Sequence, residues 1–326
     1  MCAALQQAGW QVREHAVDGS WPRPDAQART GLAKVLAAVP DGAVAVLDGL
    51  VAGGVPDVVV PHAERLRLVV LVHLPLGDET GLPADVAADL TAGERETLHA
   101  ATVVVVTSRW AAARVTEQYG LAAADVRVVA PGVDRAPVAP AGDGSKLLCV
   151  AALTPRKGHD LLIEALAAVG DLPWTCACVG PQRDPQRLAE LERLIERHRL
   201  GDRVQLAGPV VGDRLAAAYA AADLVVLPSR TETYGMVVTE ALAHGRPVLA
   251  TAVGGVPEAV GADETGRVPG LLVAAEAGAL AAGLRRWLTE PQLRSALAES
   301  ALRRRGSLTG WASAGRRLGE VLESLS

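Results

Sequence analysis

The sequence lacks phenylalanine and has only three lysines, Lys34, Lys146 and Lys157, among its 326 residues. No apolar run approaches the ~18–20 residues that a membrane-spanning helix needs. The first residues lack the charged and apolar regions of a signal peptide. The formal net charge of -5 gives no basic excess for binding nucleic acid phosphates. We therefore expect a cytoplasmic protein without a transmembrane segment or a nucleic-acid partner.

Several familiar site motifs are also absent. Cys176 and Cys178 flank a single residue in a strand-like segment, which is neither a redox CxxC motif nor a zinc knuckle. We interpret them as reduced, buried apolar residues, which suits a reducing cytoplasm. The absence of GxGxxG and of a P-loop argues against a dehydrogenase or a P-loop ATPase. No carboxylate pair has metal-ligand spacing, so we expect no metal ion and no cofactor.

What the sequence does contain is a repeated alternation of strand-length apolar runs with amphipathic helical stretches. The runs are rich in Val and Leu and continuous, which is typical of strands buried on both faces of a parallel sheet. Helices between them indicate an α/β fold. The predicted strands cover residues 43–49, 66–73, 102–108, 126–132, 146–153, 174–180, 203–208, 223–229 and 246–251.

A Pro-, Gly- and Ala-rich segment, 131–145, interrupts this alternation and reads as a linker. We predict a first Rossmann-like domain over 1–133, a linker over 134–145 and a second domain over 146–307. A C-terminal helix over 308–326 is expected to pack back on the first domain. Both domains are predicted to be doubly wound and to face each other across a cleft, with ligands beyond the carboxyl ends of the strands.

Two glutamates, Glu232 and Glu240, surround the start of a predicted helix near Gly235. The first backbone amides of a helix are unpaired and attract anions. Carboxylates beside such a site suit hydroxyl groups on either side of a bound diphosphate, as a ribose and a sugar would offer. The alternative is that both glutamates are solvated residues favoured by the helix dipole.

A second anion site is predicted at Arg156 and Lys157, which open another helix after a strand. Two cations at the positive end of a helix dipole suggest an anionic ligand that offsets the repulsion. The alternative is a pair of exposed charges on a loop. Gly254 and Gly255 follow a further strand and leave room for a ligand to approach the backbone.

Residues 146–275 resemble the donor-binding domain of the retaining glycosyltransferases of family 4, which have the GT-B fold. The matching motifs are Lys157-Gly158, "LGDRVQLAG" (200–208), "ADLVVLPSRTETYG" (222–235), "HGRPVLAT" (244–251) and "VGGVPE" (253–258), with seven residues between Glu232 and Glu240. The first half is similar more loosely, at "LVHLPLGDETGL" (71–82), "VVVTSRW" (104–110) and "PGVD" (131–134).

The resemblance implies a role for each matched residue. Lys157 would bind the donor diphosphate, Glu232 the hydroxyls of the transferred sugar and Glu240 the ribose. His73 would face the sugar near its anomeric carbon. The remaining donor-binding positions would be Arg156, Tyr234, Gly235, Met236 and Val237. Tyr234 stands where the family usually has Phe, and Arg156 is a candidate replacement for a family arginine that is missing at Ala151-Ala152-Leu153.

The start of the chain departs from the family. It reads as the middle of the family's first helix followed by its second strand, so the first strand and its glycine-rich loop are expected to be absent. We interpret this as a truncated chain, for example from a misassigned start codon. An in-frame coding sequence for the missing strand just upstream would support that interpretation.

The function implied is a metal-independent, retaining transfer of a sugar, expected to be a hexose, from a UDP- or GDP-sugar to an unknown acceptor. One alternative is an N-terminally truncated, inactive nucleotide-sugar-binding protein. Another is a phosphorylase with pyridoxal phosphate on a lysine, which the scarcity of lysine opposes. The acidic first half favours a soluble acceptor, while "LRRRGSLTGW" (302–311) leaves peripheral membrane contact open.

Overall fold

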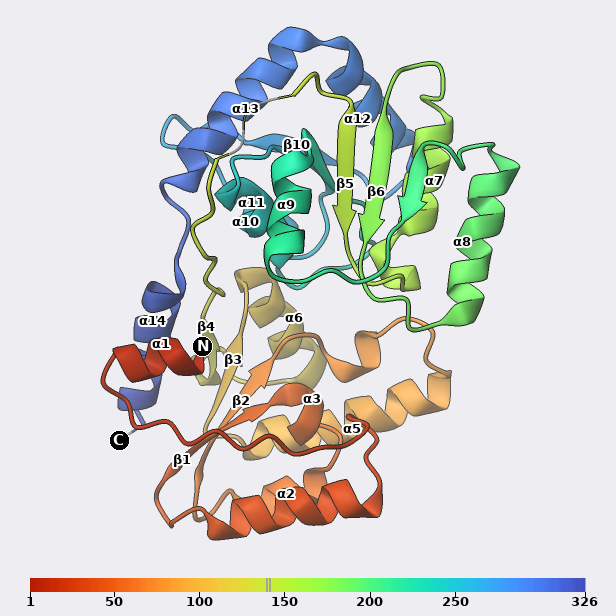
Figure 1. Ribbon diagram of the computed structural model, residues 1–326. Helices are drawn as coiled ribbons and strands as arrows, with labels where there is room; N and C mark the ends of the chain where they lie inside the picture. Colours follow the sequence, from red (N-terminus) through yellow and green to blue (C-terminus); the bar gives the residue numbers. More distant parts are fainter. Residues whose placement is uncertain (139, 141, 326) are drawn as a thin grey trace. The chain divides into compact units, whose positions relative to one another are not determined.

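The computed structural model describes residues 1–138, 140 and 142–325. Residues 139 and 141, which fall in the predicted linker, and residue 326, at the end of the predicted C-terminal helix, lie outside the described residues. The chain forms an α/β fold with two parallel sheets (Figure 1). It divides into two compact units, one made of 1–132 with 309–326 and the other of 133–308.

The first unit contains a four-stranded sheet in the order β1-β2-β3-β4, with all pairs parallel. Its strands are β1 (Val44–Asp48), β2 (Arg67–Val72), β3 (Val103–Val106) and β4 (Val126–Val128). Its α-helices are α1 (Cys2–Gln7), α2 (Ala26–Ala38), α3 (Gly49–Ala52), α4 (Pro56–Val59), α5 (Ala84–Ala100), α6 (Arg109–Tyr119) and α14 (Trp311–Glu323). Short 3-10 turns are η1 (Val60–His62), η2 (Leu76–Asp78) and η3 (Ala123–Asp125).

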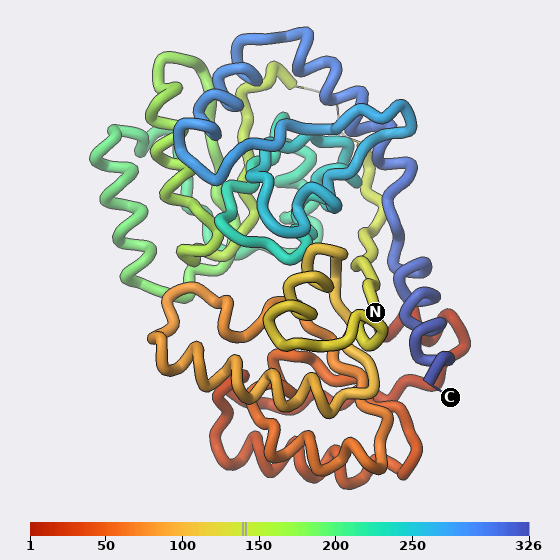
Figure 2. Tube along the Cα trace, turned by 180° about the vertical axis from the view of Figure 1, so that it is seen from behind, coloured from red at the N-terminus to blue at the C-terminus, as the bar shows by residue number. Residues whose placement is uncertain are grey.

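Alternate residues of β2 and β3 are buried on opposite faces of this sheet. Val70 and Val104 pack with α2, α5 and α6, whereas Val69 and Val105 pack with Leu5 of α1 and Leu318 of α14. The two views show α1 and α14 side by side (Figures 1 and 2). Burial on both faces explains why these strands read as continuous apolar runs.

The first sheet differs from the prediction of double winding. Its four strands lie in sequence order, so the strand order does not reverse among the described residues. Right-handed crossovers that step in one direction place their helices on one face of a sheet. The elements between β1 and β4 accordingly pack on the α2 face, and α1 and α14 cover the other.

A buried carboxyl, Glu94 of α5, holds the turn that follows β2. It is 1% exposed, accepts a hydrogen bond from the Leu76 amide at 2.7 Å and accepts another from the Tyr119 hydroxyl. Burial raises the pKa of Glu94 to about 7, although both hydrogen bonds favour the charged form. The folded protein therefore holds this proton more tightly than the unfolded chain does.

We expect the stability of the first unit to fall as pH rises from about 5 to about 8. A carboxyl whose pKa is raised on folding stabilises the fold at low pH, and that contribution is lost as pH passes the folded value. The shift to about 7 corresponds to at most about 3 kcal/mol in the free energy of unfolding. Urea unfolding of the full chain at several pH values measures the slope.

Glu94→Gln should flatten this pH dependence, because the amide stays neutral throughout. Glu96→Gln is the matched control, since Glu96 lies on the same helix and is exposed. An unchanged pH slope in the Glu94→Gln variant would show that this carboxyl does not titrate in the folded state as described.

The second unit contains a six-stranded parallel sheet in the order β10-β9-β8-β5-β6-β7. Its strands are β5 (Lys146–Val150), β6 (Thr175–Val179), β7 (Val204–Leu206), β8 (Leu224–Leu227), β9 (Val248–Thr251) and β10 (Gly270–Val273). Its helices are η4 (Pro155–Lys157), α7 (His159–Ala167), α8 (Pro185–Arg197), α9 (Asp213–Ala221), α10 (Met236–Ala243), α11 (Val256–Val260), α12 (Ala277–Thr289) and α13 (Pro291–Arg305).

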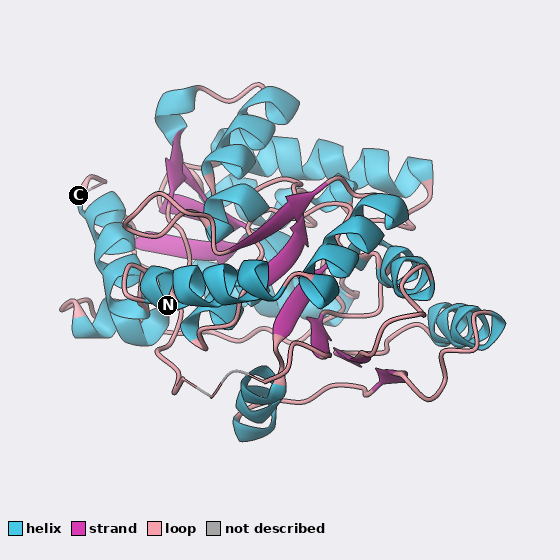
Figure 3. Ribbon diagram, turned by 90° about the horizontal axis from the view of Figure 1, so that it is seen from above, coloured by secondary structure: helices cyan, strands magenta, loops and turns pink. Residues whose placement is uncertain are grey.

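This second sheet is doubly wound, as predicted. Strand order runs outward from β5 to β7 and then resumes on the other side of β5 with β8. One face packs with α7, α8 and α12, and the other with α9, α10 and α11. The strands therefore lie between layers of helices (Figure 3). The reversal places a switch point between β5 and β8, where ligands of such sheets bind.

All nine predicted strands are present, each shorter than its apolar run, and β4 and β7 have only three residues each. The short strand β10 was missed because "GLLV" offers too few residues for a periodicity. The expected strand early in the chain is wrong, since residues 10–17 form neither helix nor strand. That segment carries Arg13, Glu14 and His15, all exposed, and these residues interrupt its apolar positions.

No helix among the described residues is both long and apolar enough to cross a membrane.

Candidate functional site

Two loops meet at the switch point of the second sheet. β5 and β8 are hydrogen-bonded neighbours, with Leu147 opposite Leu224 and Leu148 opposite Val225. The loop after β5 leads through η4 into α7, and the loop after β8 leads into α10. Because parallel strands end at the same edge, their following loops lie together, and the Arg230 amide donates to the Arg156 carbonyl at 2.8 Å.

These loops bring three of the predicted site residues into contact. The Lys157 ammonium pairs with Oε1 of Glu232, and Nη1 of Arg156 lies 3.8 Å from Oε2 of the same carboxylate. The Glu232 side chain is 7% exposed and that of Lys157 is 18% exposed. Two cationic side chains thus share one buried carboxylate, and the group of three carries one excess positive charge.

The backbone around Glu232 is fixed on several sides. The Ser229 hydroxyl donates to its carboxylate at 2.9 Å, and the Gly255 amide donates to its carbonyl at 2.9 Å. Gly254 has a φ of +54°, and a Cβ there would overlap that same carbonyl oxygen. Glycine at position 254 is therefore needed for the loop after β9 to pack against Glu232.

A second close approach joins the two loops. Gly158 has a φ of +66°, and a Cβ on it would overlap the Pro228 carbonyl oxygen. Only glycine allows both the left-handed backbone and this proximity. Gly158 thereby holds Lys157, which precedes it, against the loop that carries Glu232.

The start of α10 has the geometry that the sequence predicts. Gly235 has a φ of +91° and precedes Met236, the first residue of the helix. Helical geometry leaves the amides of Met236 and Val237 without intrahelical acceptors. Met236 is 40% exposed, so this end of the helix is open to a ligand. An anion near these amides would also lie in the favourable field of the helix dipole.

Glu240 occupies a different environment from Glu232. Its Oε2 accepts a hydrogen bond from the Tyr219 hydroxyl at 2.6 Å, and the Tyr219 ring stacks on His244 with centroids 5.0 Å apart. Burial, followed by the charge of Glu240, raises the pKa of Tyr219, so the phenol stays protonated and remains a donor. The hydrogen bond from Tyr219 of α9 therefore fixes the orientation of the Glu240 carboxylate.

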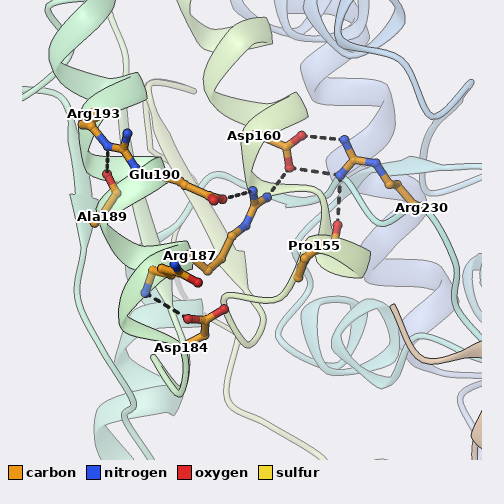
Figure 4. Close-up of polar contacts among 9 residues, drawn as sticks. Pro155, Asp160, Asp184, Arg187, Ala189, Glu190, Arg193 and Arg230 are labelled. Atoms are coloured by element: carbon orange, nitrogen blue, oxygen red, sulfur yellow. Dashed lines mark hydrogen bonds and ion pairs between the residues drawn. The ribbon is translucent and has the colours of Figure 1, made fainter. Parts of the chain in front are cut away.

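A charged network that the sequence did not predict braces the two loops (Figure 4). Asp160 of α7 pairs with both Arg187 of α8 and Arg230 of the loop after β8. Arg230 also donates to the Pro155 carbonyl at 2.9 Å. Burial disfavours ionisation of Asp160, but the two arginines outweigh it and lower its pKa to about 2. Asp160 therefore stays charged across the physiological pH range. Its ion pair with Arg230, which also contacts the Pro155 carbonyl, connects η4 to the loop after β8.

The predicted catalytic histidine lies in the first unit. His73 follows β2 directly and its Nε2 lies 3.6 Å from Oδ2 of Asp48, which ends β1. The nearby His73 side chain, which outweighs partial burial, lowers the pKa of Asp48. Both side chains are about half exposed. Arg156, Lys157 and Glu232 are thus brought together within the second unit, Glu240 contacts Tyr219, and His73 belongs to the other unit.

Comparison with known proteins matches this chain to a family and to individual relatives. The family described as "Glycosyl transferases group 1" matches residues 133–304, slightly more than half of the chain. The D-inositol 3-phosphate glycosyltransferase of Kineococcus radiotolerans is 36% identical over 248 residues, which are 67% of this chain and 56% of that protein. The chain therefore spans little more than half the length of that relative.

Solved structures share the fold. Sucrose-phosphate synthase from Thermosynechococcus elongatus superposes with a TM-score of 0.78 and 26% identity, over 99% of this chain and 91% of that one. The Anabaena protein HepE, solved with UDP and glucose, superposes with a TM-score of 0.75 and 22% identity, over 90% and 81% of the respective chains. These GT-B structures match the arrangement of two parallel sheets described above.

Proposed function

Because the chain belongs to the group 1 glycosyltransferases, we propose that it transfers a sugar from a nucleoside-diphosphate sugar to an acceptor, with retention of anomeric configuration. The observation that carries the proposal is the cluster of Arg156, Lys157 and Glu232 at the switch point of the second sheet. A cationic pocket beside a helix start suits a diphosphate, and the carboxylate beside it suits sugar hydroxyls.

In this proposal the second unit supplies most of the transition-state stabilisation. Cleavage of the bond from the anomeric carbon to phosphate builds negative charge on the leaving diphosphate and positive charge on the sugar. Lys157 and the amides of Met236 and Val237 would stabilise the leaving group, and preorganised donors of this kind are typically worth about 3–4 kcal/mol each. No step in this scheme requires a metal ion.

The two glutamates would divide the recognition of the donor. Glu232, next to Lys157, would accept hydrogen bonds from hydroxyls of the transferred sugar. Glu240, held by the Tyr219 hydroxyl at 2.6 Å, would accept hydrogen bonds from the ribose. His73 would act on the sugar from the first unit, and this role stays a prediction. The likeness to HepE, solved with UDP and glucose, favours UDP over GDP as the carrier.

A panel of UDP- and GDP-sugars tests the proposal through thermal unfolding. A donor present at about 100 times its Kd stabilises the binding-competent fold by about 2.7 kcal/mol, which shifts the midpoint of a unit of this size by roughly 5–10 °C. We expect a UDP-sugar to give this shift and a GDP-sugar to give less. Failure of every nucleotide sugar to stabilise the protein would refute the proposal.

Turnover separates a transferase from a binding protein. D-inositol 3-phosphate, the compound in the name of the Kineococcus relative, is the first acceptor to test, followed by simple sugars and their phosphates. Retention is read from the anomeric coupling constant of the product by NMR. Donor binding without hydrolysis or transfer to any acceptor would support the alternative of an inactive nucleotide-sugar-binding protein.

A further inference from the structure

Beneath the Lys157 loop, three side chains with metal-binding atoms converge in the core of the second unit. Cys149 of β5, Cys178 of β6 and His159 of α7 are all buried, and their ligand atoms lie within 4.8 Å of one another. The sequence did not reveal this group, because the residues come from three separate elements and no short motif joins them. None of the three takes part in the donor site proposed above.

The sheet register explains why the two sulfurs meet. Cys149 and Cys178 are direct partners in the parallel pairing of β5 and β6, so their side chains leave the same face of the sheet. Both belong to the core cluster under α7 and α8. Cys176, two residues before Cys178, points to that same face and belongs to the same core cluster.

The histidine is unusual for a residue of an apolar core. His159 is fully buried, its Nε2 lies 3.7 Å from Sγ of Cys149, and its Nδ1 has no hydrogen-bond partner among the described residues. Buried polar atoms without partners are rare and costly. A thiol is also a weak hydrogen-bonding partner, so the imidazole gains little from the contacts that it makes.

We propose that Cys149, Cys178 and His159 form a binding site for a Zn²⁺ ion. Zinc-sulfur bonds of about 2.3 Å and zinc-nitrogen bonds of about 2.0–2.1 Å place the sulfur and nitrogen atoms of a tetrahedral site about 3.6 Å apart. The observed sulfur-nitrogen separation is 3.7 Å. Zinc binding at Nε2 of His159 would replace two thiol protons, which leave to solvent, and would exchange the weak thiol contact of that nitrogen for a strong bond.

Charge balance favours a divalent ion such as Zn²⁺ over a monovalent one. Two thiolates and a neutral imidazole around Zn²⁺ sum to zero, which a fully buried site requires. A monovalent Cu⁺ with the same two thiolates would leave a net negative charge in the core. Cys176 would then remain a protonated neighbour, since a third thiolate would add uncompensated charge.

The position of the site gives it a structural consequence. His159 begins α7 and follows Lys157 and Gly158 directly. A zinc ion would therefore anchor the start of α7 to β5 and β6. Metal binding should raise the unfolding midpoint of the protein, an effect that does not depend on any donor or acceptor.

The test uses untagged full-length protein, because a histidine tag would itself bind zinc. The protein is refolded under reductant with Zn²⁺, passed over a weak chelating resin and analysed for metal content. We expect one zinc per chain and a higher unfolding midpoint than for protein refolded with chelator. Co²⁺ in place of Zn²⁺ should show thiolate-to-metal charge-transfer absorption.

Variants locate the ion. Cys149→Ala, Cys178→Ala and His159→Asn should each weaken zinc binding more than about 100-fold, beyond the 10–100-fold typical of changes outside the ligand set. Cys2→Ala, in the first unit, and Cys176→Ala should retain one zinc per chain. Circular dichroism checks that each variant folds, and small apolar replacements at the two cysteines suit the surrounding core.

Three outcomes would overturn the proposal. The first is folded wild-type protein that retains no zinc under reductant. The second is zinc retention that is unaffected in folded Cys149→Ala or Cys178→Ala protein. The third is a titration of the denatured, unreduced chain that finds two free thiols in place of four, because the pair would then form a disulfide.

Discussion

Lys157→Ala is expected to lower kcat for sugar transfer by about 100- to 1000-fold, the effect of removing one preorganised donor from a developing negative charge. Its ammonium is mostly buried and pairs with Glu232, so it is held in place before a donor arrives. Gly158 and the Arg230 contacts fix the loop that carries it. Initial rates of donor consumption measure the loss, and calorimetric titration with UDP should show weaker binding.

Lys146→Ala provides the matched control. Lys146 begins β5, whereas Lys157 follows the loop at the other end of that strand, and Lys146 is exposed. Removing it deletes the same charge from the same unit without touching the switch point. Near-normal turnover in the Lys157→Ala variant, with its circular dichroism spectrum unchanged, would refute the diphosphate role of this lysine.

Much of the second unit could be predicted because its signals are local. The strands read as apolar runs, and the helix after "SRTETYG" begins at Met236, as the sequence predicts. Arg156, Lys157 and Glu232 each follow a strand, and the pairing of β5 with β8 brings them together. The prediction that these residues lie close together depended on β5 and β8 being neighbours, which is the usual strand order of a doubly wound sheet.

The partners of the site residues could not be predicted in the same way. Tyr219 lies 21 residues from Glu240 along the chain, and Asp160 lies 70 residues from Arg230. Neither pair shares a motif or a periodicity, so side-chain reach across the packed elements decides the contact. The cysteine-histidine group was missed for the same reason.

In the first unit, the sequence predicted the strands but not how the helices are arranged around the sheet. Its apolar runs located the strands correctly, yet the winding of the sheet differed from the prediction. A run of valines specifies burial on both faces but not which helix covers each face. Here α14 covers one of them beside α1, in the unit on which a C-terminal helix was expected to pack. The apolar runs of the strands alone did not indicate that helix.

Glu232→Gln is expected to separate binding of the nucleotide from transfer of the sugar. The amide keeps the shape of the side chain but removes the negative charge that now pairs with Lys157 and lies 3.8 Å from Arg156. Because that carboxylate competes with a diphosphate for the same cations, its loss should tighten UDP binding by roughly 3- to 10-fold, or about 1 kcal/mol. Transfer should fall by at least about 100-fold, since the sugar hydroxyls lose a charged acceptor.

The comparison that decides the role of Glu232 is the ratio of affinities for the UDP-sugar and for UDP alone. If the carboxylate holds the sugar, this ratio falls in the Glu232→Gln variant while UDP itself binds more tightly. Glu264→Gln, an exposed change elsewhere in the second unit, should alter neither affinity. Weaker binding of UDP in the Glu232→Gln variant would contradict the sugar role, because it would mean that Glu232 serves the diphosphate by positioning Lys157. The two roles make opposite predictions for one titration, since the same carboxylate either competes with the phosphates or prepares the cation that binds them.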